Sequence, residues 1–295
     1  MGADNTSMAV ITYGQARRQG IPRSQLPGPL YKRLFQGVYT TLPSPDLAEW
    51  VRGARLFLPE DAVLSGLTAL RWHGLVLGED LPLCFVTAQR APTTRRGVDV
   101  RNRTVLPPGP VASVFDAYAE FIREATFADS VAVGDALLRK KMLSPEQVQE
   151  LMGVEHPAVR NAAKAVRKDA HSLKETLIRL ALVNAGLPEP RLQVTLGDGA
   201  GVIGDVDLYY ERYGVVIEYE GDQHRSSKPQ WNKDLKKYER LSAAHFHLIR
   251  VTAEDLHDPK GLIDRIHSAL RSRGYRGRRP RFPARFLELF EHSVL

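Results

Sequence analysis

The sequence predicts a mixed α/β (α+β) protein whose C-terminal half holds a mixed β-sheet flanked by helices. Three observations support this prediction. Apolar residues recur at helical spacing through residues 111–152 and 156–186. The pattern then changes to the alternation typical of strands, in QVTLG, VIGDVDLYY and VVIEYEG. One amphipathic helical pattern, WNKDLKKYERLSAA, separates these strands from a last one, FHLIRVT.

Residues 1–45 predict a small winged-helix-like module for binding DNA. A short helix in ITYGQARRQG is closed by Gly20, a second short helix begins near Pro22, and the β-prone stretch YKRLFQGVYTT follows. Helix, turn, helix and hairpin is the order of a winged helix. Pro27 and Pro29 shorten the second helix, which weakens it as a reader of the major groove.

Residues 46–164 predict a mixed, mainly helical middle domain. Two helical patterns cover residues 46–74, and strands are expected at CFVTA and VDVRNRTV. The PPGP after Leu106 breaks the chain before the helices of residues 111–152. The stretch from His156 predicts one long helix or two, ended by Gly186 and stopped by Pro188.

Residues 165–270 predict the α/β domain, and residues 271–295 a basic tail. The tail has seven arginines against two glutamates, and its composition favours a flexible arm. The formal net charge of the chain is +7, and most of it comes from this tail. The clustered tail, rather than the total charge, therefore favours a polyanionic partner such as nucleic acid.

Composition also bears on location. The 295 residues are 43% hydrophobic and 25% charged, which excludes a disordered or fibrous protein. No apolar run is long enough to span a membrane, and the first twenty residues lack a secretory signal. The single cysteine, Cys84, suits a reducing compartment. We therefore expect a cytoplasmic protein without a membrane partner.

The most informative segment is GDVDLYYERYGVVIEYEGDQH. With a turn at residues 211–214, an antiparallel hairpin places Asp207 opposite Glu218 and Asp205 opposite Glu220. Four carboxylates then share one face, although opposed like charges destabilise a strand pair. A divalent cation removes this repulsion, so the hairpin predicts a site for Mg²⁺ or Mn²⁺. The alternative is the solvated acidic face of an ordinary hairpin.

Further residues converge on this hairpin. Glu175 can reach the sheet from the preceding helix, or it forms an ion pair with Arg179 one helical turn away. His224, just past the second strand, can contact a phosphate, a water or the metal, or it is an ordinary loop residue. A basic helical surface beside the acids suits the phosphates of a nucleic-acid backbone, or is simply solvated; it consists of Lys233, Lys236, Lys237 and Arg240.

The segment from Ser172 to about Leu256 resembles a known family. The motifs ETLIRLALVNAGLPEPRLQV, GDVDLYY, VVIEYEGDQH, WNKDL and LIRVTAEDL are similar to domain-of-unknown-function family 559. That family is related to the very-short-patch-repair (Vsr-like) endonucleases of the PD-(D/E)xK nuclease superfamily. The resemblance implies a restriction endonuclease-like sheet. The N-terminal motifs TYGQARRQGIPRSQL, LYKRLFQGVYTT and LSGLTALRWHGL more loosely resemble the winged helix of AbiEi-type antitoxins.

The resemblance also implies roles for individual residues. Asp207 matches the first acid of the signature and Glu218 the second, while Glu220 stands where a lysine is usual. Glu175 matches a helix glutamate that supports the metal site, and His224 matches a histidine after the second strand. Superfamily members with Glu at the lysine position include active enzymes, and other members without the lysine are inactive folds.

Two functional hypotheses follow. The first is a Mg²⁺- or Mn²⁺-dependent endonuclease that hydrolyses DNA phosphodiester bonds in DNA repair or phage defence, with Asp207, Glu218 and Glu220 as metal ligands and His224 and Glu175 in support. The second is a non-catalytic, antitoxin-like DNA-binding regulator with a degenerate nuclease domain. Double-stranded DNA is the expected partner and RNA the alternative substrate. A homodimer that cuts both strands and a monomer remain alternatives.

Overall fold

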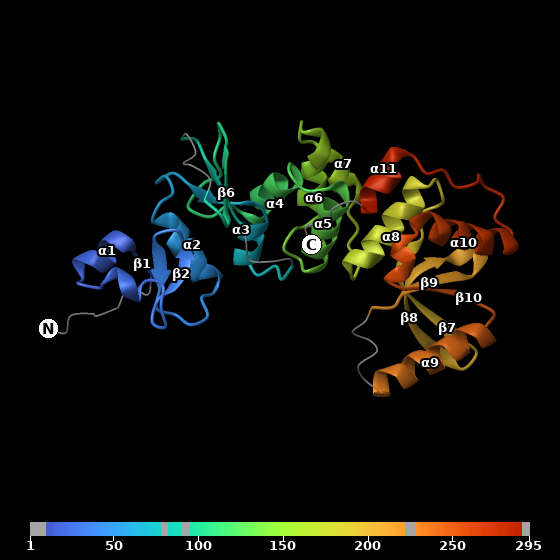
Figure 1. The fold of residues 1–295 in the computed structure, drawn as a ribbon. Coiled ribbons are helices and arrows are strands. Elements are labelled where there is room, and N and C mark those ends of the chain that lie inside the picture. The colour runs from blue at the N-terminus through green and yellow to red at the C-terminus, as the bar shows by residue number, and fades with distance from the viewer. Residues whose placement is uncertain (1–9, 78–81, 90–94, 222–227, 291–295) are drawn as a thin grey trace. The chain divides into compact units, whose positions relative to one another are not determined.

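The computed structural model describes residues 10–77, 82–89, 95–221 and 228–290. The chain forms two compact units, one up to Glu124 and one from Ala125 onward (Figure 1). The second unit thus begins well before residue 165, where the sequence pattern placed the start of the α/β domain. In the described ranges, no helix has both the length and the apolar character needed to cross a membrane.

The first unit opens with a three-stranded sheet of order β1-β3-β2. Thr12 caps the first helix by accepting a hydrogen bond from the main-chain N–H of Gln15, whose side chain bonds back to Thr12. The expected second helix is a single 3₁₀ turn, so the described residues hold no long recognition helix in this module. The elements are β1 Val10–Thr12, α1 Tyr13–Arg18, η1 Arg23–Gln25, β2 Lys32–Phe35 and β3 Val38–Thr40.

The rest of the first unit follows the predicted order of helices and strands except at Val63–Leu64, which the sequence pattern assigned to a helix and which forms a short strand, β4. Strand β5 pairs with β4 in the antiparallel sense and with β6 in the parallel sense, which gives a second three-stranded sheet. The strands expected at CFVTA and VDVRNRTV are therefore confirmed. The elements are α2 Leu47–Arg55, β4 Val63–Leu64, α3 Gly66–Trp72, β5 Leu83–Thr87, β6 Val98–Asn102 and α4 Val114–Ile122.

The second unit begins with helices. The stretch from His156 forms two helices rather than one, and the second ends before Gly186, whose φ of +85° a non-glycine residue rarely adopts. These helices are α5 Phe127–Arg139, α6 Pro145–Met152, α7 Pro157–Ala165 and α8 Leu173–Asn184.

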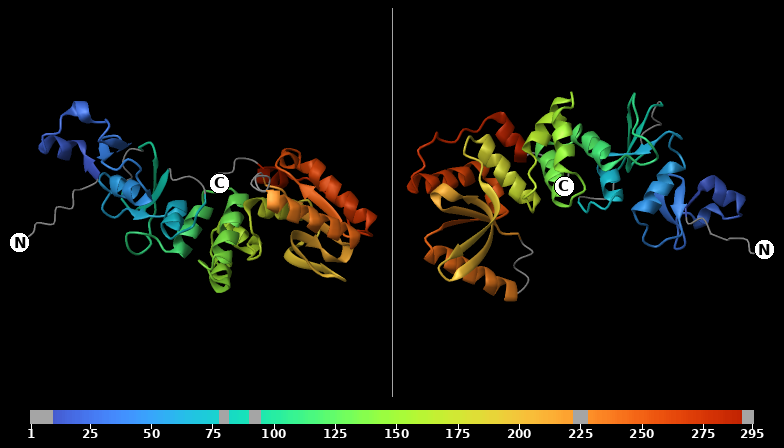
Figure 2. Two further views of the ribbon diagram at one scale, coloured as in Figure 1. Left: turned by 90° about the horizontal axis from the view of Figure 1, so that it is seen from below. Right: turned by 180° about the vertical axis from the view of Figure 1, so that it is seen from behind.

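A four-stranded mixed sheet of order β10-β9-β8-β7 follows. The pairs β7–β8 and β8–β9 are antiparallel, and β9–β10 is parallel across the crossover helix α9. Helix α9 covers one face, while α8 and α10 cover the other (Figures 1 and 2). This confirms a mixed α/β fold. The elements are β7 Arg191–Asp198, β8 Gly201–Tyr210, η2 Glu211–Tyr213, β9 Val215–Tyr219, α9 Lys228–Ala243, β10 His247–Val251, η4 Glu254–His257 and α10 Pro259–Ser272.

The basic tail is ordered through residue 290, which corrects the expectation of a flexible arm. Tyr275, Phe286 and Leu289 are buried, and the main-chain N–H of Arg281 donates to the main-chain oxygen of Ala185 at 2.9 Å. The tail ends in the short elements α11 Ala284–Leu287 and η5 Glu288–Phe290, both of which contact α8. Aromatic side chains between the arginines therefore anchor this segment to the unit.

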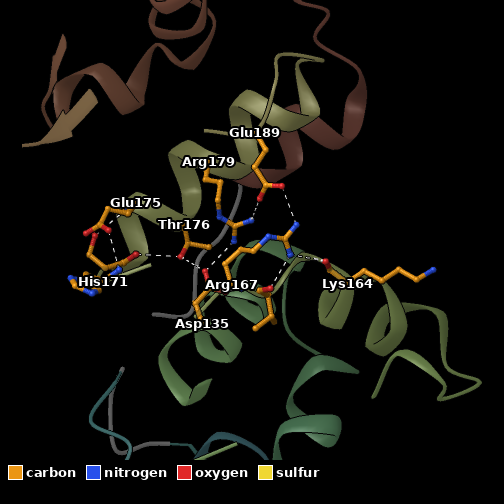
Figure 3. A network of polar contacts seen from close by, with 10 residues as sticks. Asp135, Lys164, Arg167, His171, Glu175, Thr176, Arg179 and Glu189 are labelled. Carbon is orange, nitrogen blue, oxygen red and sulfur yellow. Dashed lines mark hydrogen bonds and ion pairs between the residues drawn. The ribbon is translucent and has the colours of Figure 1, made fainter. Parts of the chain in front are cut away.

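A buried polar network joins α5 to α8 (Figure 3). Arg179 is 1% exposed, and its Nη2 lies 3.1 Å from Oδ2 of Asp135, which also accepts the Thr176 hydroxyl at 2.7 Å. The other carboxylate oxygen accepts the main-chain N–H of Arg167 at 2.6 Å, and Arg179 Nη1 lies 3.2 Å from Glu189. Breaking a buried pair of this kind leaves an uncompensated charge. The helices α5–α7 are therefore integral to the second unit.

We expect Asp135→Asn to lower the free energy of unfolding by about 3 kcal/mol, because the guanidinium of Arg179 loses its buried counter-charge. Urea unfolding followed by circular dichroism measures this loss. The matched control is Glu150→Gln on the exposed side of α6, expected within about 0.5 kcal/mol of the unaltered protein. Equal stabilities for the two variants would show that the network contributes nothing.

Candidate functional site

The hairpin formed by β8 and β9 has the register that the sequence predicts. Leu208 pairs with Ile217, Tyr209 with Val216 and Tyr210 with Val215, around the turn η2. Val206, Leu208 and Ile217 are fully buried. The positions next to the Leu208–Ile217 pair are Asp207 and Glu218, so these two carboxylates lie on neighbouring strands. The predicted opposition of Asp207 and Glu218 is therefore supported by the register.

The carboxylate of Asp207 is held by two hydrogen bonds. Its Oδ2 accepts the main-chain N–H of Tyr219 at 2.9 Å, at the end of β9. Its Oδ1 accepts Nε2 of Gln193 at 3.2 Å. Asp207 is thereby fixed between β7 and β9.

Gln193 connects two acids, and sequence reasoning missed it. The same Nε2 donates to Oε2 of Glu175 at 2.9 Å, so one amide bridges Glu175 and Asp207. Gln193 has φ +46°, an unfavourable backbone conformation for a non-glycine residue within a strand. The register of β7 skips this residue, between the pairs Leu192–Leu208 and Val194–Val206. No sequence signal marks it, because a glutamine in an otherwise β-prone run reads as an ordinary strand residue.

Glu175 lies in the first turn of α8. The side chain of Ser172 caps the helix by accepting the main-chain N–H of Glu175 at 3.1 Å, and Glu175 Oε2 accepts the main-chain N–H of His171 at 3.0 Å. Glu175 is 5% exposed. Burial raises the pKa of its carboxyl group, and the nearby charge of Asp207 raises it further. The predicted approach of Glu175 to the sheet is thus observed, and its expected ion pair with Arg179 is not formed, because Arg179 binds Asp135 and Glu189.

Glu218 is buried and is paired with a lysine from α9. Its Oε1 lies 2.5 Å from Nζ of Lys237. Burial raises the pKa of Glu218, Lys237 opposes this rise, and the charges of Asp207 and Asp234 add to it. The repulsion among the acids at this end of the sheet is therefore only partly compensated by the chain itself.

Three carboxyl groups, those of Glu175, Asp207 and Glu218, thus converge with one ammonium group. Glu218 Oε2 accepts no hydrogen bond from the described part of the chain. Carboxylate oxygens are the donors that Mg²⁺ prefers, and it is commonly held by one or two of them with waters and substrate phosphate. Asp207 and Glu218 fit that set. Across the described ranges, no group of three or more His, Cys, Asp or Glu side chains is arranged to hold a metal ion.

Glu220 and Asp205 do not join this group, which differs from the predicted cluster of four acids. Arg250 on β10 binds both carboxylate oxygens of Glu220, Oε2 at 2.6 Å, and the Tyr238 hydroxyl lies 3.4 Å from Oε1. Asp205 faces β7 instead, where its Oδ1 accepts the Thr195 hydroxyl at 2.5 Å. The parallel pairing of β9 with β10, which brings Arg250 to Glu220, is not visible in the local sequence of the hairpin.

The other predicted residues have different environments. His224 lies outside the described residues. Lys233 and Lys236 are exposed on α9, as a nucleic-acid contact requires. Arg240, in contrast, binds the carboxylate of Asp198 at 2.7 and 3.0 Å and the main-chain oxygens of Gly201 and Val202, so it fastens α9 to the β7–β8 turn. The predicted basic surface is thus reduced to two exposed lysines.

We expect Glu175→Gln to become more stable relative to the unaltered protein as the pH rises from about 4.5. The pKa of Glu175 in the folded state lies above the ordinary value of 4.5. The unfolded chain therefore ionises this group at a lower pH than the folded protein does, and the folded state loses stability as the pH rises above about 4.5. A glutamine has no such ionisation. Urea unfolding at pH 4.5 to 8 measures the difference, with Glu239→Gln, a change at an exposed position of α9, as the control. A difference independent of pH would contradict this account.

At position 193 we expect glycine to be better tolerated than alanine by about 1 kcal/mol, because φ +46° strains every residue except glycine. Both variants lose the same two hydrogen bonds, so only the backbone differs. At Thr195, a regular position of the same strand, the order reverses, because glycine in a strand costs about 0.5–1 kcal/mol relative to alanine. Thermal unfolding of the four variants tests this reversal in the order of stability. If glycine and alanine had the same order of stability at both positions, the backbone of Gln193 would not be strained.

Comparison of the chain with known protein families, with curated proteins and with solved structures finds no match. The candidate site at the end of the β7–β10 sheet consequently rests on its own geometry, that is, on the paired strands that carry Asp207 and Glu218, the buried Glu175 and the contacts of Gln193 and Lys237.

Proposed function

We propose that this chain is a divalent-metal-dependent endonuclease with a restriction endonuclease-like α/β domain, and that it hydrolyses phosphodiester bonds of DNA. The observation that carries the proposal is the convergence of Asp207, Glu218 and the buried Glu175 at one end of the sheet. Folding alone disfavours three acids in this position, because their mutual repulsion and burial cost free energy. A hard cation and a phosphate ester are the partners that such a group accommodates.

In this proposal Asp207 and Glu218 hold Mg²⁺ or Mn²⁺. When bound, the ion polarises the phosphate and lowers the pKa of a water. Gln193 and the main-chain N–H of Tyr219 keep Asp207 oriented, and Glu175 is anchored by the first turn of α8. In the net reaction, the oxygen of a water bonds to phosphorus while one P–O bond to a sugar oxygen breaks. The water loses its proton to solvent, and the released sugar oxygen takes one.

The substrate assignment rests on exposed cations in each of the two units. Lys233 and Lys236 project from the exposed side of the helix that carries Lys237. In the first unit, residues 10–45 contain five arginine or lysine residues and no acidic residue, and all five are exposed: Arg17, Arg18, Arg23, Lys32 and Arg33. Such cations neutralise backbone phosphates of either nucleic acid. Double-stranded DNA is proposed from the order of helix and hairpin that this region keeps, although its second helix is a single 3₁₀ turn, and cleavage of RNA instead is an outcome of the test.

The second candidate is a DNA-binding regulator whose α/β domain lacks catalysis. The ion pair between Glu220 and Arg250 favours it, because this pair occupies the strand position at which an active site of the proposed kind ordinarily carries a lysine. A regulator binds DNA in a salt-dependent way and is indifferent to divalent cations and to the charge of Asp207.

We expect the purified chain to nick supercoiled plasmid in the presence of Mg²⁺ or Mn²⁺, and Asp207→Asn to lower the rate by at least about 100-fold, because one of the two proposed metal ligands loses its charge. Gel analysis of plasmid, linear duplex and RNA measures cleavage. Glu239→Gln, an exposed change on α9, is the control. Equal rates for Asp207→Asn and the unaltered chain, or cleavage of no substrate, would contradict the proposal.

Calorimetric titration with Mn²⁺ separates the two candidates. The endonuclease predicts heat of binding that Asp207→Asn abolishes and Glu239→Gln preserves. If the chain is a regulator, neither the unaltered protein nor the Asp207→Asn variant gives heat of binding with Mn²⁺, and both bind DNA. Binding of Mn²⁺ that survives the loss of Asp207 would place the cation elsewhere on the chain.

A further inference from the structure

Lys237 occupies an unusual position among the cations of α9. Its ammonium lies 2.5 Å from Oε1 of the buried Glu218 and also donates to the main-chain oxygen of Asp205. Its stem runs over Gly204, where a Cβ would lie 3.7 Å from the Lys237 methylenes. Gly204 has φ +149°, so the strand itself is shaped by a residue without a side chain at the point where the lysine crosses it.

Its neighbours on the helix behave differently. Lys233 and Lys236 are exposed, and neither makes an ion pair within the described part of the chain. Arg240 is committed to Asp198. Lys237 alone among these four cations enters the carboxylate group, where its side chain is only 20% exposed. A cation that tracks a nucleic-acid backbone has no reason to be placed against a buried glutamate.

We propose that Lys237 is the active-site lysine of this chain, supplied by α9 rather than by β9, and that its ammonium stabilises the negative charge that develops on the scissile phosphate. This inference rests on the proposed endonuclease function. It also gives Lys237 a different role from the backbone contact expected from the sequence.

The geometry of β9 explains why the helix supplies this charge. Glu220 lies two residues after Glu218, on the same side of the strand, and its carboxylate is bound by Arg250 from β10. Position 220, where the resemblance leads us to expect a lysine, therefore contributes no positive charge to the site. The helix that crosses above it contributes one ammonium group, and the three carboxyl groups outnumber it, so the site can still accommodate a divalent cation.

The ammonium has donors to spare for a substrate. It carries three N–H groups, of which the structure uses one for Glu218 and one for the oxygen of Asp205. The flexible four-carbon stem allows the head to shift from Glu218 to a phosphate oxygen when metal and substrate enter. Because this shift is short and the charge stays inside the site, the ammonium needs little further reorganisation at the moment of reaction.

The test is single-turnover cleavage at saturating DNA by Lys237→Met. We expect the rate to fall by about 100-fold or more, as on removal of one preorganised donor, while the DNA dissociation constant stays within about twofold. Lys237→Arg keeps a positive charge and recovers part of the rate. Lys260→Met, an exposed lysine of α10, is the control with unchanged rate. Lys236→Met lowers DNA affinity and its salt slope by about one, as a backbone contact does.

A second measurement needs no DNA. The ammonium competes with an incoming cation for Oε1 of Glu218, so Lys237→Met should bind Mn²⁺ several-fold more tightly than the unaltered chain in calorimetry, while Lys260→Met does not. Tighter Mn²⁺ binding with loss of cleavage supports the inference. Cleavage that survives in Lys237→Met, or a loss of DNA affinity alone, overturns it and leaves the endonuclease standing. An unaltered chain that cleaves nothing overturns both.

Discussion

The candidate site depends on one constraint, which is that two like charges occupy neighbouring positions of paired strands. The register of β8 with β9 places Asp207 and Glu218 on neighbouring strands, each next to the Leu208–Ile217 pair, and Glu218 is buried. The surrounding contacts can be understood as responses to this repulsion. Gln193 and the main-chain N–H of Tyr219 restrain Asp207, and Lys237 offsets the charge of Glu218.

Local patterns in the sequence predicted the strands, the turn and the register, because side-chain alternation and turn length are local properties. They also predicted the approach of Glu175. The local patterns failed where a side chain pairs with a residue distant in the sequence. Arg250 forms an ion pair with Glu220, and Asp198 forms one with Arg240, so neither Glu220 nor Arg240 has its predicted role. The tail was mistaken for a flexible arm because its arginines dominate the composition, while a few aromatic side chains, Phe286 among them, decide its packing. The predicted second helix of the first module is a single 3₁₀ turn, which ends before Pro27 and Pro29.

The helices before the sheet also bear on the site. Thr176 and Arg179 bind Asp135 of α5, and Glu175 is adjacent to Thr176 (Figure 3). Because α8 carries the Glu175 carboxyl group at its first turn, the orientation of that group depends on the anchoring of the whole helix. Helix α5, which the sequence pattern assigned to a separate middle domain, therefore helps to position the acids.

The left-handed backbone of Gln193 makes this residue a marker of descent. The amide of Gln193 reaches Glu175 and Asp207 together, whereas β-branched residues lack this reach and are disfavoured at such a φ. A related chain with valine or threonine at this position would therefore have a straighter strand and no bridge between the two acids. The residue at position 193 then distinguishes related chains that keep this bridge from those that have only the acids.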